Sequence, residues 1–427
     1  MKKAKIKIRV LALVILIAIF IPSMFSCAGE KNNSSADSDV KANAENQGSD
    51  GEAGDSAAAP VDKRQINLAL YDYPEVDYNG YEFKILIRGK ADEWDSQDIF
   101  AEEDSGDVVE SSVYRRNLEV EEKLNIKIKA LWVLVADQFN RLRKSVTAGD
   151  NSYDAVMLNL EDASKATKEN YFANLADTSG VDLTKPWWDQ SVMKETSVMN
   201  KIYFATGDIS IMDNDGTWTM MFNKQIHKNL GLPDIYDIVK KGEWTIDKFL
   251  ELGKGVTADL DGNGKIDYLD QVAFATTLDS TQGLFYSTGL RIVKKDENDL
   301  PYYSLTGDVV MTNLAKIFEV YRGAEDFTMV SADYPNTPHG GSTHRVVQDA
   351  FEQNRALFYA EVMQCVKRLR QMDTEFGIIP LPKGNVEQKD YNTYIHSWAS
   401  ATIAIPKGGE DEDRSSVVIE ALAYGGY

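Results

Sequence analysis

Hydrophobic and polar positions divide the chain into three stretches. The first nine residues carry five basic side chains and no acid, and an unbroken run of twelve apolar residues follows at Val10–Ile21. Residues 28–62 lack Leu, Ile, Met and every aromatic residue. From about Lys63 onward, short apolar runs alternate with amphipathic segments, which is typical of a folded body.

The folded body opens with an alternation of strands and helices. Tyr81–Arg88 and Ile126–Leu131 are predicted as strands, and Val108–Leu124 between them is predicted as a helix. Asp154–Leu158 is a short continuous apolar run, typical of a parallel strand that is covered on both faces. Because strands and helices alternate, the sequence predicts an α/β fold.

Size and charge narrow the possibilities further. A single hydrophobic core stops growing near about 250–300 residues, so 427 residues indicate two compact units. A formal net charge of −21 argues against a nucleic-acid-binding protein, which needs clustered Lys and Arg. The two Cys residues are too few for a disulfide framework or a Cys-rich zinc site.

The N-terminal pattern is that of an export signal. Twelve apolar residues are fewer than the roughly 20 that span a membrane, and a basic start followed by a short apolar run favours a secretory signal. Met24–Gly29 resembles a bacterial lipoprotein signal, which implies that residues 1–27 form the signal peptide and that Cys27 is lipidated. The alternative is an ordinary cleaved signal with an incidental Cys. Residues 28–62, with eight acids and two Lys, are expected to be a disordered acidic tether.

A calcium-loop pattern lies at residues 259–270. Side-chain oxygens occupy loop positions one, three, five and nine, Gly264 occupies the sharp-turn position, and Lys265 would offer its backbone carbonyl. An Asp stands at position twelve, as in dockerin-type loops. Oxygen ligands at this spacing suit Ca²⁺, so a structural calcium is expected; an acidic turn without metal is the alternative. The expected ligands are Asp259, Asp261, Asn263, Lys265, Asp267 and Asp270.

A set of short segments then carries a family resemblance. In chain order they are Ala173–Leu175, Lys185–Asp189, Lys201–Tyr203, Thr217–Trp218, Phe222–Lys224, Gly242–Thr245, Phe351–Tyr359, Phe376–Lys383 and Ala404–Lys407. This order resembles the extracellular solute-binding proteins of ABC-type sugar importers, the maltose-binding-protein-like group. The resemblance implies two α/β lobes with a hinge and an interlobe cleft. It also implies a non-enzymatic protein that captures a sugar and delivers it to a membrane permease.

The same resemblance implies the domain boundaries. Lobe one would comprise residues 63–213 and 383–427, lobe two residues 214–376, and residues 377–382 would be a hinge crossing. The family continues beyond the helix expected at Ser416–Leu422, so the chain is expected to be truncated at its C-terminus. The protein is expected to be a monomer, held by its lipid at the extracytoplasmic face of the cell membrane.

Candidate sugar contacts come from strand ends and from the resemblance. Sugar sites combine aromatic faces with carboxylates and amides, and ligands of open α/β sheets bind at the carboxyl ends of strands. Trp398 is the favoured stacking residue. Core packing is the alternative for the buried aromatics, and plain solvation is the alternative for the acids. The candidates are Trp94, Asp95, Asn159, Glu161, Asp162, Trp218, Tyr359, Glu361 and Trp398.

Catalytic chemistry has little support in the sequence. It contains no Gly-x-Ser-x-Gly, His-Glu-x-x-His or P-loop motif. His339 and His344 are interpreted as part of a plain loop, His227 and His396 have no evident catalytic partner, and Cys365 is expected to be a buried thiol. Two alternatives stay open: a surface glycan-degrading enzyme, and a binding protein for a non-sugar solute such as a peptide.

Overall fold

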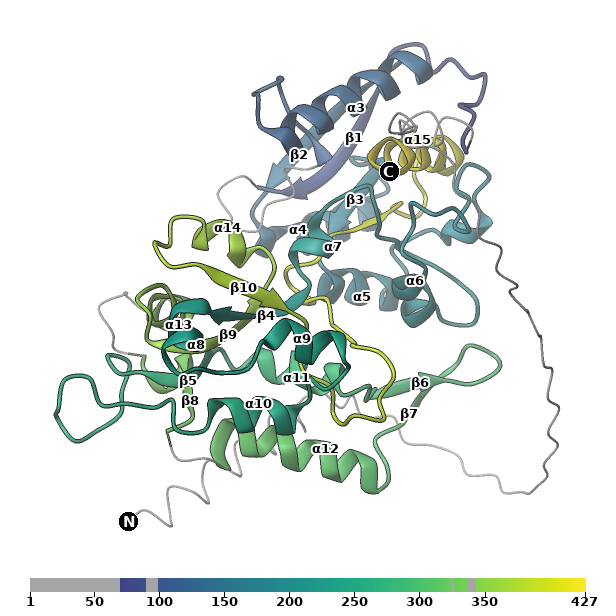
Figure 1. Cartoon of the computed structure of the whole chain (residues 1–427). Coiled ribbons are helices and arrows are strands. Elements are labelled where there is room, and N and C mark those ends of the chain that lie inside the picture. The colour runs from purple at the N-terminus through teal and green to yellow at the C-terminus, as the bar shows by residue number, and fades with distance from the viewer. Residues whose placement is uncertain (1–69, 90–98, 324–325, 336–342) are drawn as a thin grey trace, which may run out of the picture. The chain divides into compact units, whose positions relative to one another are not determined.

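The computed structural model describes residues 70–89, 99–323, 326–335 and 343–427 (Figure 1). The expected signal peptide with Cys27, the expected tether, and the candidates Trp94 and Asp95 lie outside the described residues. Among the residues that are described, no helix is both long enough and apolar enough to cross a membrane.

The first lobe is built on a four-stranded sheet with the order β11-β3-β1-β2. β1 (Tyr81–Arg88) pairs in parallel with β2 (Ile126–Val133) and β3 (Ala155–Leu158), and β11 (Thr402–Ala404) runs antiparallel to β3. Helices cover the sheet, and its central strand β3 is apolar and buried throughout, whereas β1 carries Glu82, Lys84 and Arg88 among its apolar residues. These helices are α3 (Val108–Leu124), α4 (Val135–Ala148), α5 (Leu160–Lys168) and α15 (Glu412–Gly426).

The second lobe is built on a five-stranded sheet with the order β10-β4-β9-β5-β8. β9 pairs in parallel with β5 and antiparallel with β4, so the sheet is mixed. Its core gathers large aromatic side chains, among them Trp244, Phe249 and Phe358. The strands are β4 (Trp218–Asn223), β5 (Val272–Thr276), β8 (Thr328–Val330), β9 (Ala356–Val362) and β10 (Phe376–Ile379).

Shorter elements complete the two lobes. Thr245 caps α10 (Ile246–Gly253) by accepting a hydrogen bond from the backbone N–H of Lys248 at 3.2 Å. The first lobe adds α6 (Gln190–Thr196) and α7 (Met212–Asp215). The second adds α8 (Lys224–Asn229), α9 (Ile235–Lys240), α10 (Ile246–Gly253), α11 (Ser280–Ser287), α12 (Asp308–Phe318), α13 (Thr343–Glu352), α14 (Cys365–Leu369) and the hairpin β6 (Val293–Lys295)–β7 (Pro301–Tyr303).

The chain passes between the lobes in two places. Met212 belongs to the first core and Trp218 to the second, so the first passage lies between them. On the return, Lys383 does not begin the first lobe, because its N–H donates to the carbonyl of Trp244 at 3.0 Å. Tyr394 also packs against the second core. The boundary expected at residue 383 therefore moves to a point after residue 394.

The hairpin β6–β7 also contacts the first lobe. The carboxylate of Asp299 accepts hydrogen bonds from the Ser197 hydroxyl at 3.1 Å and from the Asn200 N–H at 2.9 Å. Lys295 forms an ion pair with the same carboxylate at 2.9 Å. The two lobes are thus joined by polar contacts outside the connecting segments.

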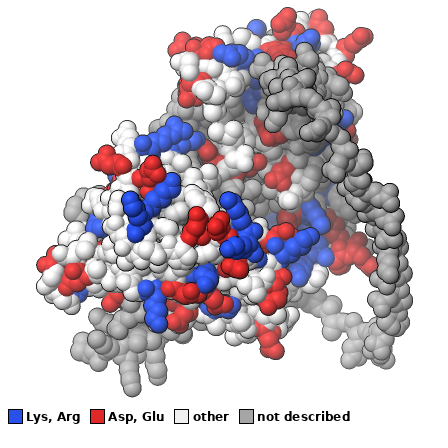
Figure 2. Space-filling view, viewed as in Figure 1, with Lys and Arg blue, Asp and Glu red and all other residues white. Residues whose placement is uncertain are grey.

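Charged side chains of both signs are interspersed over the face shown in Figure 2. Because opposite charges are neighbours, they form surface ion pairs, such as that between Lys224 and Glu375 at 3.1 Å.

Candidate functional site

A turn at residues 396–400 lies against the carboxyl ends of β1 and β3. The N–H of Leu160, just beyond β3, donates to the Ser397 carbonyl and to the Ser400 hydroxyl, both at 3.0 Å. Arg88, the last residue of β1, donates from Nη2 to the Trp398 carbonyl at 3.0 Å. The fold therefore places Trp398 at the edge of the sheet where ligands of α/β proteins bind.

Arg88 also fixes the indole of Trp398. Its guanidinium carbon lies 4.7 Å from the centre of the Trp398 ring, a cation–π stack. Arg88 is only 2 % exposed, whereas Trp398 is half-buried. The stack orients an aromatic side chain that remains partly open to solvent, which is the arrangement needed for stacking on the C–H face of a sugar.

Polar side chains gather at the corresponding strand ends of the second lobe. Asp279 follows β5, Glu361 lies near the end of β9, and His344 lies in the first turn of α13. Nδ1 of His344 is 3.2 Å from Oε2 of Glu361. This hydrogen bond to a nearly buried carboxylate raises the pKa of His344 above its usual value.

His396 connects this polar group to the Trp398 turn. Its Nδ1 accepts hydrogen bonds from the backbone N–H groups of Trp398 at 3.2 Å and Ala399 at 3.3 Å. Its Nε2 lies 4.0 Å from Oδ2 of Asp279. Burial lowers the pKa of His396 below the usual value, so the neutral ring is favoured. The imidazole packs 5.9 Å from the ring of Trp218.

Two predicted contact residues are core residues instead. Tyr359 is fully buried, and its hydroxyl lies 3.3 Å from Sγ of Cys365. Trp218 is 2 % exposed and packs in the second core. The reason is position within the sheet: β4 and β9 are inner strands, and every residue of both is buried. Glu361 is also buried, but it faces His344 at the strand end.

Asn159 has a structural role that accounts for its side chain. It is 3 % exposed, and its Oδ1 accepts a hydrogen bond from the N–H of Asp162 at 2.8 Å, so it is the N-cap of α5. Glu161 and Asp162 lie in the first turn of the same helix and pair with Lys165 at 2.9 and 3.0 Å. Asn159 is therefore a helix cap, and its contact with a sugar stays a prediction.

Sequence reasoning missed four of the polar residues at the strand ends. Arg88 could have been predicted from the sequence, because a charged residue that ends an apolar strand lies at the edge of the sheet. His396 precedes Trp398 by two residues, and this spacing could have indicated a local turn contact. Asp279 and His344 are brought close to their partners only by folding, so no local pattern identifies them.

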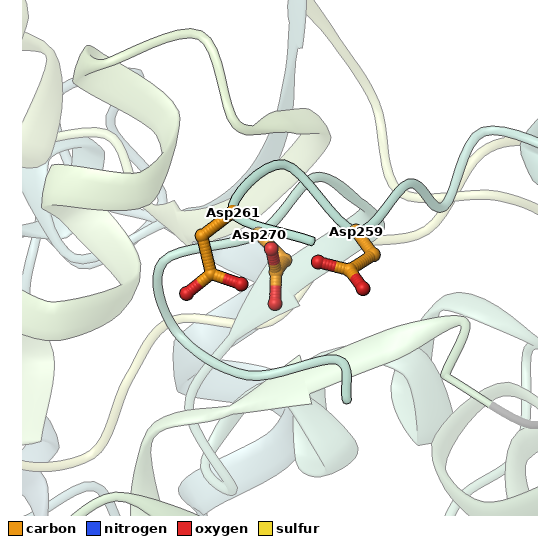
Figure 3. Close-up of side chains that lie close together, drawn as sticks. All are labelled: Asp259, Asp261 and Asp270. Atoms are coloured by element: carbon orange, nitrogen blue, oxygen red, sulfur yellow. The ribbon is translucent and has the colours of Figure 1, made fainter. Parts of the chain in front are cut away.

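The acidic loop has a geometry that suits a cation. Carboxylate oxygens of Asp259, Asp261 and Asp270 all lie within 4.8 Å of one another, and Figure 3 shows them on one side of the loop. The Asp259 carboxylate accepts hydrogen bonds from the N–H groups of Gly262 and Gly264, both at 2.7 Å. These bonds lower the pKa of Asp259 and keep it ionised.

Asp270 closes the loop from its far end. It is fully buried, and its two oxygens accept from the N–H groups of Leu260 at 2.8 Å and Asp267 at 2.9 Å. Asn263 and Asp267 form local turns. The side chain of Asn263 accepts a hydrogen bond from the N–H of Lys265, and that of Asp267 accepts one from the N–H of Leu269. The structure thus brings three of the six expected ligand residues together through their carboxylates.

A polar surface pocket of about 440 Å³ lies elsewhere on the first lobe. Lys201, Lys407 and the acids at the start of α15 line it, and Lys407 donates to Asn170 at 3.0 Å. None of the strand-end residues described above lines this pocket. The candidate site is therefore the Trp398 turn with its polar neighbours, because that arrangement offers both an aromatic face and hydrogen-bonding groups.

Known structures share the fold. A cyclo/maltodextrin-binding protein complexed with maltotetraose aligns with a TM-score of 0.53 and 14 % identity over 80 % of this chain and 74 % of its own. The sugar-binding protein MalE from Xanthomonas citri aligns with a TM-score of 0.54 and 13 % identity over 80 % of this chain and 75 % of its own. An ABC substrate-binding protein from Listeria monocytogenes in complex with cycloalternan aligns with a TM-score of 0.51 and 14 % identity over 81 % of this chain and 75 % of its own.

These similarities were found by comparing structures. No family model matches the sequence, and no curated protein matches it either. The agreement in fold confirms the α/β, two-lobed architecture that the sequence resemblance implied. The chain has the two-lobed fold of the sugar-binding proteins of ABC importers.

Proposed function

We propose that this protein is the carbohydrate-binding subunit of an ABC importer. The observation that carries the proposal is the Trp398 turn: a partly exposed indole, oriented by Arg88, at the strand ends of one lobe. Through His396 the turn approaches Asp279 of the other lobe. The structures that share the fold include proteins complexed with maltotetraose and with cycloalternan, which supports an oligosaccharide as the solute.

Binding would work by closure of the two lobes on the sugar. The indole of Trp398 would stack on the C–H face of a sugar ring, and carboxylates such as Asp279 would accept hydrogen bonds from its hydroxyl groups. A sugar that contacts both lobes binds the closed state more tightly, so it shifts the population toward that state. The permease would recognise the closed, loaded form.

The proposal includes a location. A lipid on Cys27 would hold the protein at the extracytoplasmic face of the membrane, and residues 28–62 would give it reach to a permease. One acyl chain gives only marginal anchoring, whereas two or more hold stably.

A structural calcium ion at residues 259–270 is part of the same proposal. Three carboxylates converge within 4.8 Å, and Gly264 supplies the turn at the position where such loops need it. Asp259, Asp261 and Asp270 would hold the ion. It would neutralise their mutual repulsion and fix the loop that leads into β5.

The test is a binding screen joined to a product assay. The full-length protein is incubated with maltotetraose, cycloalternan and a panel of other oligosaccharides, and melting temperature and newly formed reducing ends are both measured. The proposal expects a rise in melting temperature with at least one saccharide and no release of reducing ends. Release of reducing ends would favour a glycan-degrading enzyme, and stabilisation only by peptides would favour a non-sugar solute.

A further inference from the structure

We infer that His396 is a positioning residue for the Trp398 platform and that it does this only with an uncharged ring. The effect of His396 on ligand binding rests on the proposed function. The hydrogen bonds of His396 in the ligand-free protein do not depend on which ligand binds. A backbone N–H can only donate. Nδ1 of His396 faces two of them, those of Trp398 and Ala399, so it must carry a lone pair and no proton.

The remaining ring nitrogen then carries the proton. Nε2 lies 4.0 Å from the Asp279 carboxylate, and a protonated Nε2 directed at an anion is favourable. One tautomer therefore suits both ends of the ring, with two hydrogen bonds at Nδ1 and a longer electrostatic contact at Nε2. Through it, the position of the Trp398 turn is linked to Asp279, a residue of the second lobe.

A second proton on His396 would break this arrangement. Protonated Nδ1 becomes a donor that faces two donors, so the turn would lose both hydrogen bonds. The charged groups around the ring act in opposite directions: the carboxylates of Asp279 and Glu361 favour the charged ring, and His344 opposes it. Burial is the largest influence and opposes the charge. The ring consequently stays neutral near pH 7 and takes up the proton under acidic conditions.

Arg88 holds the same platform from the other side, through its stack on the indole and its bond to the Trp398 carbonyl. Because Arg88 keeps its charge at all relevant pH values, it cannot supply a pH response. When the His396 contacts are lost, the backbone N–H groups of Trp398 and Ala399 lose their acceptor. The Trp398 carbonyl keeps its hydrogen bond from Arg88. The expected consequence is a reoriented indole and a weaker complex at acidic pH.

The experiment follows Trp398 directly. The full-length protein is labelled with 5-fluorotryptophan, and the Trp398 resonance is assigned with Trp398→Phe among the seven tryptophans. Fluorine NMR spectra of the ligand-free protein are recorded from about pH 7.5 to about pH 5, with circular dichroism as the check on folding. We expect the Trp398 resonance to move in the wild type. It should stay in place in His396→Asn, whose amide oxygen still accepts from the turn but does not titrate.

Affinity for maltotetraose, measured over the same pH range, provides the second readout. His396→Asn should lose the pH dependence of binding, and its affinity at pH 7.5 should be lower than that of the wild type because Asn lacks the ring nitrogen that faces Asp279. His396→Ala should bind about tenfold more weakly throughout, the usual effect of losing such hydrogen bonds. His227→Asn is the matched control, because His227 lies on α8 and contacts Pro233 instead.

Two results would overturn the inference: a Trp398 resonance that does not respond to acid in the wild type, or the same response in His396→Asn. If maltotetraose does not bind the wild type, the proposed ligand class loses support. The fluorine spectra of the ligand-free protein would still decide the role of His396.

Discussion

Glu420 shows how a single residue can control the stability of the first lobe. It is buried in the core, where its two oxygens accept hydrogen bonds from the indole N–H groups of Trp187 at 3.1 Å and Trp188 at 2.9 Å. Burial nevertheless raises the pKa of Glu420 to about 7. The indole donors thus only partly offset the cost of removing a charge from water.

This pKa predicts how stability depends on pH. In the unfolded chain the carboxyl loses its proton near its ordinary value of 4.5, whereas in the folded protein it keeps the proton up to about pH 7. The folded state binds the extra proton between these values, so its stability falls as pH rises through that window. By linkage this group contributes a loss of about 3 kcal/mol at most.

Urea unfolding at about pH 5 and about pH 8 measures the effect. Glu420→Gln cannot titrate, so the variant should lack this part of the pH dependence. It should also be somewhat less stable at pH 5, because its amide N–H₂ faces one indole donor. An identical pH dependence in wild type and variant would show that Glu420 does not titrate in this range.

At the scale of elements, much of the fold follows from local pattern. The strand predicted at Tyr81–Arg88 and the helix predicted at Val108–Leu124 have these bounds in the structure, because a continuous apolar run and a helical period are local signals. α15 begins at Glu412 rather than Ser416, since Asp411 caps it by accepting from the Arg414 N–H at 2.8 Å. Its first turn is polar, so hydrophobic periodicity did not mark the start.

The acidic loop at residues 259–270, which we propose binds calcium, gives a prediction at the same scale. Removing calcium with a chelator should lower the melting temperature, since a ligand present at a hundred times its Kd stabilises the folded state by about 2.7 kcal/mol. Asp261→Ala should melt lower than the wild type in calcium and should respond little to chelator. Scanning calorimetry with added calcium or with chelator measures both effects.

Asp373→Ala is the matched control, because Asp373 is an exposed carboxylate outside the loop. This variant should keep the full response to chelator. Equal melting of the wild type with calcium and with chelator would mean that the loop is an acidic turn without metal.

At the scale of the whole molecule, sequence reasoning reached the architecture but only part of the site. Trp398 lies at the carboxyl ends of β1 and β3, close to the start of the strand Thr402–Ala404, and its contact with a sugar stays a prediction. Tyr359 lies in the core, and the sequence did not show this, because local pattern does not tell an inner strand of a sheet from an exposed one. The contact between His396 and Asp279 joins residues more than a hundred positions apart, and only the packed fold brings them together.

The proposed membrane attachment also belongs to the scale of the whole molecule. The proposed lipid on Cys27 predicts that wild-type protein fractionates with membranes and that Cys27→Ser is released into the soluble fraction. Cys365→Ser is the control, because that thiol is buried in the second lobe and should not affect attachment. Retention of Cys27→Ser on membranes, measured by fractionation and immunoblotting, would contradict the lipid anchor.

The central claim is that Trp398 binds a carbohydrate, and one calorimetric titration tests it most directly. The full-length protein and Trp398→Ala are each titrated with the saccharide that raises the melting temperature most in the screen. The account predicts saturable one-to-one binding by the wild type and a loss of at least about tenfold in affinity for Trp398→Ala, as expected for a buried aromatic contact. Equal affinity in the two proteins, or no binding of any saccharide by the wild type, would contradict it.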